Sequence, residues 1–67
     1  MNKNLLRSIM VLWNDTNAKL ADYLGITQSR LSAKMNEWEG AQFTQSEIRM
    51  IRDRYNLTSD QLMEIFF

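Results

Sequence analysis

Apolar residues recur along this chain at intervals of three and four positions, which is the period of amphipathic helices. No proline interrupts the chain, so helices can run between short turns. The pattern predicts five helices and no strand. The first is expected to span about Asn4 to Trp13. Its predicted core residues are Leu5, Ile9 and Leu12, helped by Leu6, Met10 and Trp13.

Between residues 16 and 36 the pattern predicts two short helices separated by a single glycine. Thr16 is placed to cap the first of them, and Gly25 is placed to end it in the left-handed conformation. Thr27 caps the next helix only two residues later, so the helices must cross sharply and Ile26 fills the corner. This arrangement is typical of a helix-turn-helix motif, which points to DNA recognition.

The second helix of the motif has an inward and an outward face. Successive residues of a helix are rotated by about 100° around its axis. If Leu31 and Met35 point inward, the opposite side therefore carries Ser29, Ala33 and Asn36, and the flanks carry Arg30 and Ser32. Gln28 lies in the first turn, where its amide can both donate to and accept from an adenine edge in the major groove.

Capping patterns predict where the last two helices begin. Thr44 with Glu47, and Thr58 with Gln61, have the spacing of a capping box. The expected core residues of these helices are Ile48, Ile51 and Tyr55, then Leu62, Ile65 and Phe66, with Leu57 between the two helices. A loop from Glu37 to Phe43 is the longest irregular segment that the pattern predicts.

The segment L-A-D-Y-L-G-I-T-Q-S-R-L-S, Leu20 to Ser32, resembles the phage Cro and repressor family of helix-turn-helix proteins, related to the lambda repressor DNA-binding domain. The likeness extends more loosely over nearly the whole chain, including the closing L-T-S-D-Q-L-M-E-I-F-F. It implies one all-α domain over residues 1–67, a compact five-helix lambda repressor-like fold with the motif at about 16–36. It also implies that Asn17, at the start of the first motif helix, and Gln28 and Ser29, at the start of the second, match positions that contact phosphate and bases in the family.

The leading hypothesis is therefore a sequence-specific DNA-binding transcriptional regulator, a Cro-like phage repressor, with double-stranded operator DNA as its partner. The expected base-contacting residues are Gln28, Ser29, Ser32 and Ala33. The expected phosphate-contacting residues are Thr16, Asn17, Lys19, Arg30, Lys34 and Asn36. A single motif covers few base pairs, so we expect a homodimer, at least on DNA. Apolar residues of the C-terminal helix, Leu62, Phe66 and Phe67, are candidates for that or another partner interface.

Composition excludes several other functions. The chain has no cysteine and no histidine, which removes disulfides, thiolate nucleophiles, imidazole bases and the usual zinc sites. We expect no catalytic residue, no metal and no cofactor. The longest apolar run, Ile9 to Trp13, is far short of the ~20 residues that span a bilayer, so a cytoplasmic protein without a membrane partner is expected.

The net charge is zero, but its distribution is uneven. Residues 1–36 carry five basic and two acidic side chains, a net charge of +3, whereas residues 37–67 carry three basic and six acidic ones, a net charge of −3. The basic half contains the motif. This asymmetry favours attraction of that half to phosphate, although an excess of three charges is also common on an ordinary solvated surface.

Glu37, Trp38 and Glu39 depart from the expected pattern, because two carboxylates directly after a recognition helix would be repelled by phosphate. Trp38 is either folded back onto the core or exposed as an interface anchor. The second hypothesis is therefore a phage antirepressor or modulator that binds a repressor protein through the same fold. An antitoxin-like role is a third hypothesis.

Overall fold

Hydrogen-bonded caps set the start of every α-helix in the computed structural model, which describes residues 1–67. A side-chain oxygen at each N-cap accepts a backbone N–H of the first turn, and the caps are Asn2, Thr16, Thr27, Thr44 and Thr58. The helices are α1 Lys3–Leu12, α2 Asn17–Leu24, α3 Gln28–Met35, α4 Gln45–Tyr55 and α5 Ser59–Phe66, with a short 3₁₀ turn, η1, at Trp38–Gly40. The predicted all-α fold with five helices is confirmed, as are both capping boxes.

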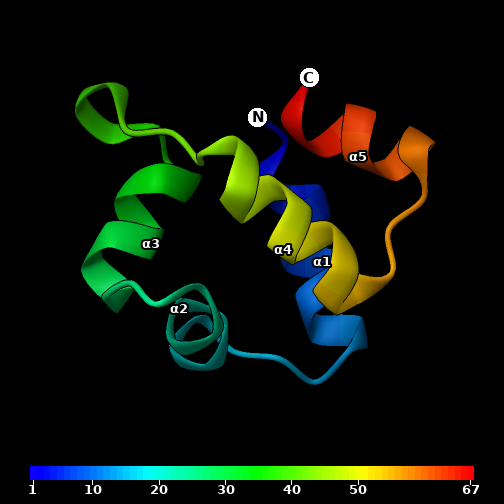
Figure 1. Cartoon of the computed structure of the whole chain (residues 1–67), viewed down its shortest axis with the longest axis horizontal. Coiled ribbons are helices and arrows are strands. Elements are labelled where there is room, and N and C mark those ends of the chain that lie inside the picture. The colour runs from blue at the N-terminus through cyan, green and yellow to red at the C-terminus, as the bar shows by residue number, and fades with distance from the viewer.

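The helices enclose one hydrophobic core to which every α-helix contributes. Its fully buried members include Leu6, Leu20, Leu31, Ile51 and Ile65, one from each α-helix in turn. In Figure 1, α2 and α3 lie on one side of the molecule and α5 lies on the other. The core therefore holds the α2–α3 pair as part of a single unit.

The two ends of the chain lie close together (Figure 1). α1 packs against α5, and the backbone N–H of Asn2 donates to the carbonyl of Ile65 at 2.7 Å. This contact ties the start of α1 to the end of α5, on the side of the molecule away from α2.

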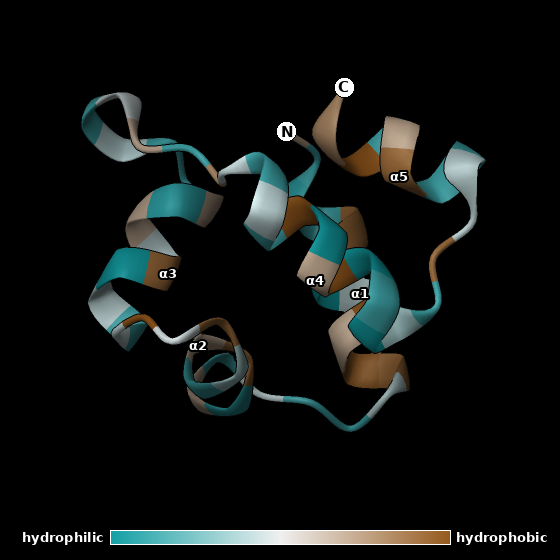
Figure 2. Cartoon of the chain, viewed as in Figure 1, coloured by the Kyte–Doolittle hydropathy of each residue, from teal (hydrophilic) through white to brown (hydrophobic).

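The prediction for the first helix is partly wrong. Its inward stripe is Leu6, Ile9 and Met10, which are buried, whereas Leu12 is 82% exposed and Trp13 is 53% exposed. Leu12 lies about 120° around the helix from Leu6, so it cannot share that stripe. Trp13 lies beyond the last helical residue and packs against the Tyr55 ring in a T-shaped arrangement, with ring centroids 6.2 Å apart. Figure 2 shows hydrophobic residues at the end of α1, where Val11, Leu12 and Trp13 are exposed.

Candidate nucleic-acid interface

The turn between α2 and α3 has the geometry that the sequence predicts. Gly25 adopts φ 74° and ψ 29°, the left-handed conformation that ends α2. The backbone N–H of Ile26 then donates to the carbonyl of Ala21 at 3.0 Å, and the Ile26 side chain packs against the core. Thr27 accepts the backbone N–H of Arg30 at 3.1 Å and starts α3. The expected sharp connection between two short helices is confirmed.

The structure places the candidate base-contacting residues on the free side of α3. Leu31 and Met35 are buried, as the period predicts. Gln28, Ser29 and Ser32 are exposed, and Ala33 is half-buried. The outer face of α3, which we define as residues 28, 29, 32, 33 and 36, is therefore short, neutral and free of other helices.

Most of the candidate phosphate-contacting residues are also exposed. Thr16, Asn17 and Lys19 surround the start of α2, where backbone N–H groups and the positive end of the helix dipole attract anions. Arg30 is exposed on α3. Asn36 is exposed but already engaged, since its Oδ1 accepts from Lys3 Nζ at 2.6 Å and its Nδ2 donates to the Ser32 carbonyl at 3.0 Å.

Lys34 is the exception, and its expected contact with phosphate needs correction. Its side chain is only 10% exposed, and its Nζ donates to both carboxylate oxygens of Glu47 at 2.6 and 2.8 Å. Lys34 follows Leu31 by three residues, which places it on the inward side of α3. The helical period alone therefore predicts burial of Lys34, whereas its charge predicts exposure.

Glu47 holds α3 against α4 through two sets of bonds. Its Oε1 accepts from Lys34 and also accepts the backbone N–H of Thr44 at 2.8 Å, which completes the capping box of α4. Burial alone would raise the pKa of Glu47, but the hydrogen bonds from Lys34 and Thr44 outweigh it and leave the pKa below its ordinary value. The carboxylate therefore stays ionised in contact with the buried ammonium group.

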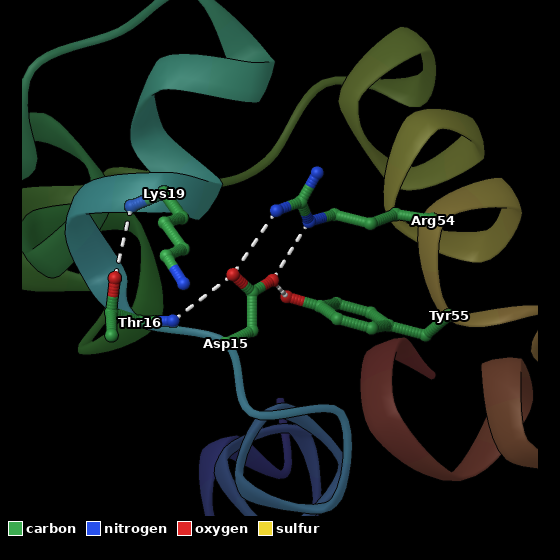
Figure 3. Close-up of polar contacts among 5 residues, drawn as sticks. All are labelled: Asp15, Thr16, Lys19, Arg54 and Tyr55. Atoms are coloured by element: carbon green, nitrogen blue, oxygen red, sulfur yellow. Dashed lines mark hydrogen bonds and ion pairs between the residues drawn. The ribbon is translucent and has the colours of Figure 1, made fainter.

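A second polar cluster, which sequence analysis missed, fixes α2. The side chain of Asp15 is 4% exposed and accepts from the Arg54 guanidinium at 2.7 and 3.0 Å (Figure 3). It also accepts from the Tyr55 hydroxyl and from the backbone N–H of Thr16. The Arg54 hydrogen bond is the main reason that the pKa of Asp15 is lowered to about 2. Asp15 and Arg54 are 39 residues apart, and no local pattern indicates that they meet.

Arg54 holds α2 near both of its ends. Besides its bonds to Asp15, just before α2, its guanidinium carbon lies 4.7 Å from the centre of the Tyr23 ring, in the last turn of α2. Burial, together with the hydrogen bond to Asp15, raises the pKa of Tyr55 above its ordinary value. The last turn of α4 therefore determines the position of α2, and with it the start of the candidate interface.

Trp38 is not folded back onto the core, because it is 64% exposed. It belongs to a tight turn of residues 37–40, which we call the Trp38 turn. Glu37 and Glu39 both have positive φ, 52° and 51°, as does Gly40 at 80°. The turn lies directly after α3, and one shallow concavity is lined by Ser29, Ser32, Ala33, Asn36 and Trp38.

The C-terminal helix offers less apolar surface than the sequence suggested. Leu62 and Phe66 are half-buried and pack against the core, and the Phe66 ring meets Phe43 edge to face with centroids 5.9 Å apart. Only Met63, 59% exposed, and Phe67, 72% exposed, remain on the outside of this segment. Of the three candidates for a partner interface in this segment, Leu62, Phe66 and Phe67, only Phe67 is exposed.

No helix of this structure is both long enough and apolar enough to cross a bilayer. Comparison with known protein families, with curated proteins and with solved structures finds no match to this chain.

Proposed function

We propose that this protein is a sequence-specific DNA-binding transcriptional regulator, a Cro-like phage repressor, that inserts α3 into the major groove of operator DNA. The observation that carries the proposal is the outer face of α3. Gln28 and Ser29 project from its exposed first turn, while Leu31 and Met35 fix the opposite side in the core. An exposed recognition helix braced by a preceding helix is the docking geometry of helix-turn-helix proteins.

Gln28 is the proposed reader of a base, and the chain contains a matched control for it. The same three residues, Thr-Gln-Ser, begin both α3 and α4, so Gln45 occupies the same exposed first helical position as Gln28. Gln28→Ala should weaken binding to the best site about 5- to 150-fold, because a bidentate base contact contributes ~1–3 kcal/mol of discrimination. Gln45→Ala should have no such effect.

The test uses fluorescence anisotropy with labelled duplexes from DNA flanking the gene and with random duplexes. The proposal expects wild-type protein to prefer one duplex and Gln28→Ala to lose that preference. Equal losses on specific and random DNA would show that Gln28 contacts only the backbone. Absence of any preference in the wild-type protein would reject the proposed function.

A homodimer on DNA is part of the proposal, because α3 spans only eight residues and two half-sites about 34 Å apart would extend the recognised sequence. Met63 and Phe67 are the exposed apolar residues of the C-terminal segment that could join two copies. Sedimentation of the protein with and without a palindromic duplex tests this. A strict monomer in both samples would remove the dimer from the proposal.

A second candidate function is binding of a repressor protein, and burial of Lys34 favours it. With Lys34 paired to Glu47, Arg30 is the one basic residue of α3 that remains exposed, while Trp38 and Glu39 are exposed beside the neutral outer face. Glu39→Lys separates the two candidates, because Glu37 is already bonded to the Met1 amino group and Glu39 is not. The change should strengthen DNA binding and steepen its salt dependence if DNA is the partner, or weaken a complex with a basic repressor if a protein is.

A further inference from the structure

The Trp38 turn has a backbone conformation that two of its residues rarely adopt. Glu37 and Glu39 are left-handed, a conformation that glycine, asparagine and aspartate adopt far more readily than glutamate. The turn is nevertheless closed by hydrogen bonds, from Gly40 N–H to the Glu37 carbonyl at 3.3 Å and from Ala41 N–H to the Trp38 carbonyl at 3.0 Å. The indole is thus held in place by an ordered but strained turn. Strain of this kind is more common at functional sites than elsewhere.

Packing of the core does not explain this geometry. Trp38 is 64% exposed, and it is Phe43, further along the same connection, that packs against the core. Trp13 is exposed as well, but its ring rests against Tyr55. No aromatic contact of that kind involves Trp38. The turn therefore positions a large apolar ring at the surface beside α3.

Of the two hollows that Trp38 lines beside α3, one is neutral. It is lined by Ser29, Ser32, Ala33, Asn36 and Trp38, none of which is charged. Ala33 and Trp38 also line a neighbouring hollow, which contains the charged residues Arg30, Lys34 and Glu39. The Glu37 carboxylate bonds to the Met1 amino group. A neutral surface with two apolar members, Ala33 and Trp38, suits the edge of a base better than it suits a phosphate.

We infer that Trp38 extends the base-reading surface of α3 and, together with Ala33, receives the methyl group of a thymine in the major groove. The thymine methyl is the distinctive apolar group that base pairs present in that groove, and apolar side chains are its usual contacts. This inference rests on the proposed function, because it needs α3 to enter the groove. It assigns a preference for thymine to a residue outside the helix-turn-helix motif.

The experiment compares thymine with uracil, which differ only by that methyl group. The best duplex is first selected from random DNA with the wild-type protein, and deoxyuridine then replaces thymidine at one position at a time. At one or two positions the replacement should weaken binding of the wild-type protein about fourfold, the effect of burying one methyl group. Trp38→Ala should bind the thymine duplex at least that much more weakly and should no longer distinguish thymine from uracil there.

Trp13→Ala is the matched control, because it removes the other exposed tryptophan at a distance from the outer face of α3. It should keep the difference between thymine and uracil, even if its absolute affinity changes. Trp38→Phe should keep part of the difference, because it retains an apolar ring. Circular dichroism checks that all variants stay helical.

The outcomes separate this inference from the proposed function. If Gln28→Ala loses specificity while Trp38→Ala keeps both its affinity and its preference for thymine, the inference is wrong and DNA recognition by α3 stands. If the wild-type protein selects no sequence, both are wrong. If Trp38→Ala leaves DNA binding unchanged but loses binding to a co-encoded repressor, Trp38 belongs to a protein interface and the inference is overturned.

Discussion

Before α3 the chain turns through Gly25, Ile26 and Thr27, and after α3 it turns through residues 37–40. In the first turn every residue suits its conformation, since glycine is left-handed, isoleucine packs inward and threonine caps. In the Trp38 turn two glutamates are left-handed and the tryptophan between them is exposed. The two connections flank the same helix, but only in the first do the residue types favour the backbone conformation.

The residues that hold α2 and α3 in place are needed for the fold. The conformation of the Trp38 turn is not explained by packing of the core. The α2–α3 pair is fixed by its caps, by the Asp15 cluster below α2 and by the buried contact between Lys34 and Glu47 behind α3. We call these elements the frame. Changes in the frame should reduce stability, whereas replacing a left-handed glutamate of the Trp38 turn by glycine should raise it.

The largest expected effect is in the frame, at Lys34. Lys34→Met should lower the free energy of unfolding by about 3 kcal/mol, because it leaves the Glu47 carboxylate buried without its partner. The double variant Lys34→Met/Glu47→Gln should recover most of this loss, since glutamine is neutral and can still complete the capping box. Urea denaturation measures both. A loss below ~1 kcal/mol for Lys34→Met would indicate that the ion pair does not hold α3 in place.

The second largest expected effect is the loss, in acid, of the stability that Asp15 contributes to the folded protein. The pKa of Asp15 is lowered to about 2 in the folded protein, so its contribution to stability is complete above the unfolded pKa of 3.8 and is lost as pH falls from about 4 to 2. A shift of this size corresponds to about 2 kcal/mol. Asp15→Asn should be less stable than wild type at pH 6, and the gap should narrow by about that amount at pH 2. A constant gap between the two proteins would contradict this assignment.

A smaller loss is expected in the turn before α3. Gly25→Ala should cost about 1 kcal/mol, because the left-handed conformation opposes a Cβ by ~1–2 kcal/mol while the stiffer unfolded chain recovers part of it. No atom lies within 4 Å of the added Cβ, so backbone strain is the only cause. Gly40→Ala meets the same conditions and should cost about the same. Thermal unfolding compares them, and a much larger loss for Gly25→Ala would mean that the α2–α3 turn has a further constraint.

Local pattern was enough to predict most of the fold. Each α-helix has its cap and its apolar stripe within a few residues, so Thr16, Gly25 and Thr27 could be assigned from sequence alone. The predicted core was wrong at the end of α1. The helical period does place Leu12 about 120° from Leu6, away from the buried stripe, but no local pattern shows that the neighbouring helices leave Trp13 largely exposed.

The candidate site was predictable to the same extent. The exposed positions of Gln28, Ser29 and Ser32 follow from the period of α3. The buried pairing of Lys34 does not follow from its charge, because its partner lies 13 residues away on another helix. The geometry of the Trp38 turn was also beyond prediction, since glutamate rarely adopts a left-handed conformation and sequence alone gives no reason to expect it twice.

The smallest expected effect is a gain in stability within the Trp38 turn. Glu39→Gly should raise the free energy of unfolding by about 0.5 kcal/mol, since relief of ~1–2 kcal/mol of left-handed strain outweighs the ~0.4–1 kcal/mol by which glycine favours the unfolded chain. Asn56→Gly is the control. Asn56 has nearly the same φ, 50°, but asparagine tolerates it, so this change should bring no gain. Urea denaturation of both variants decides the point: a loss of stability in Glu39→Gly as large as in Asn56→Gly would show that the turn is unstrained, and the contrast between the two connections would then reduce to the exposure of Trp38.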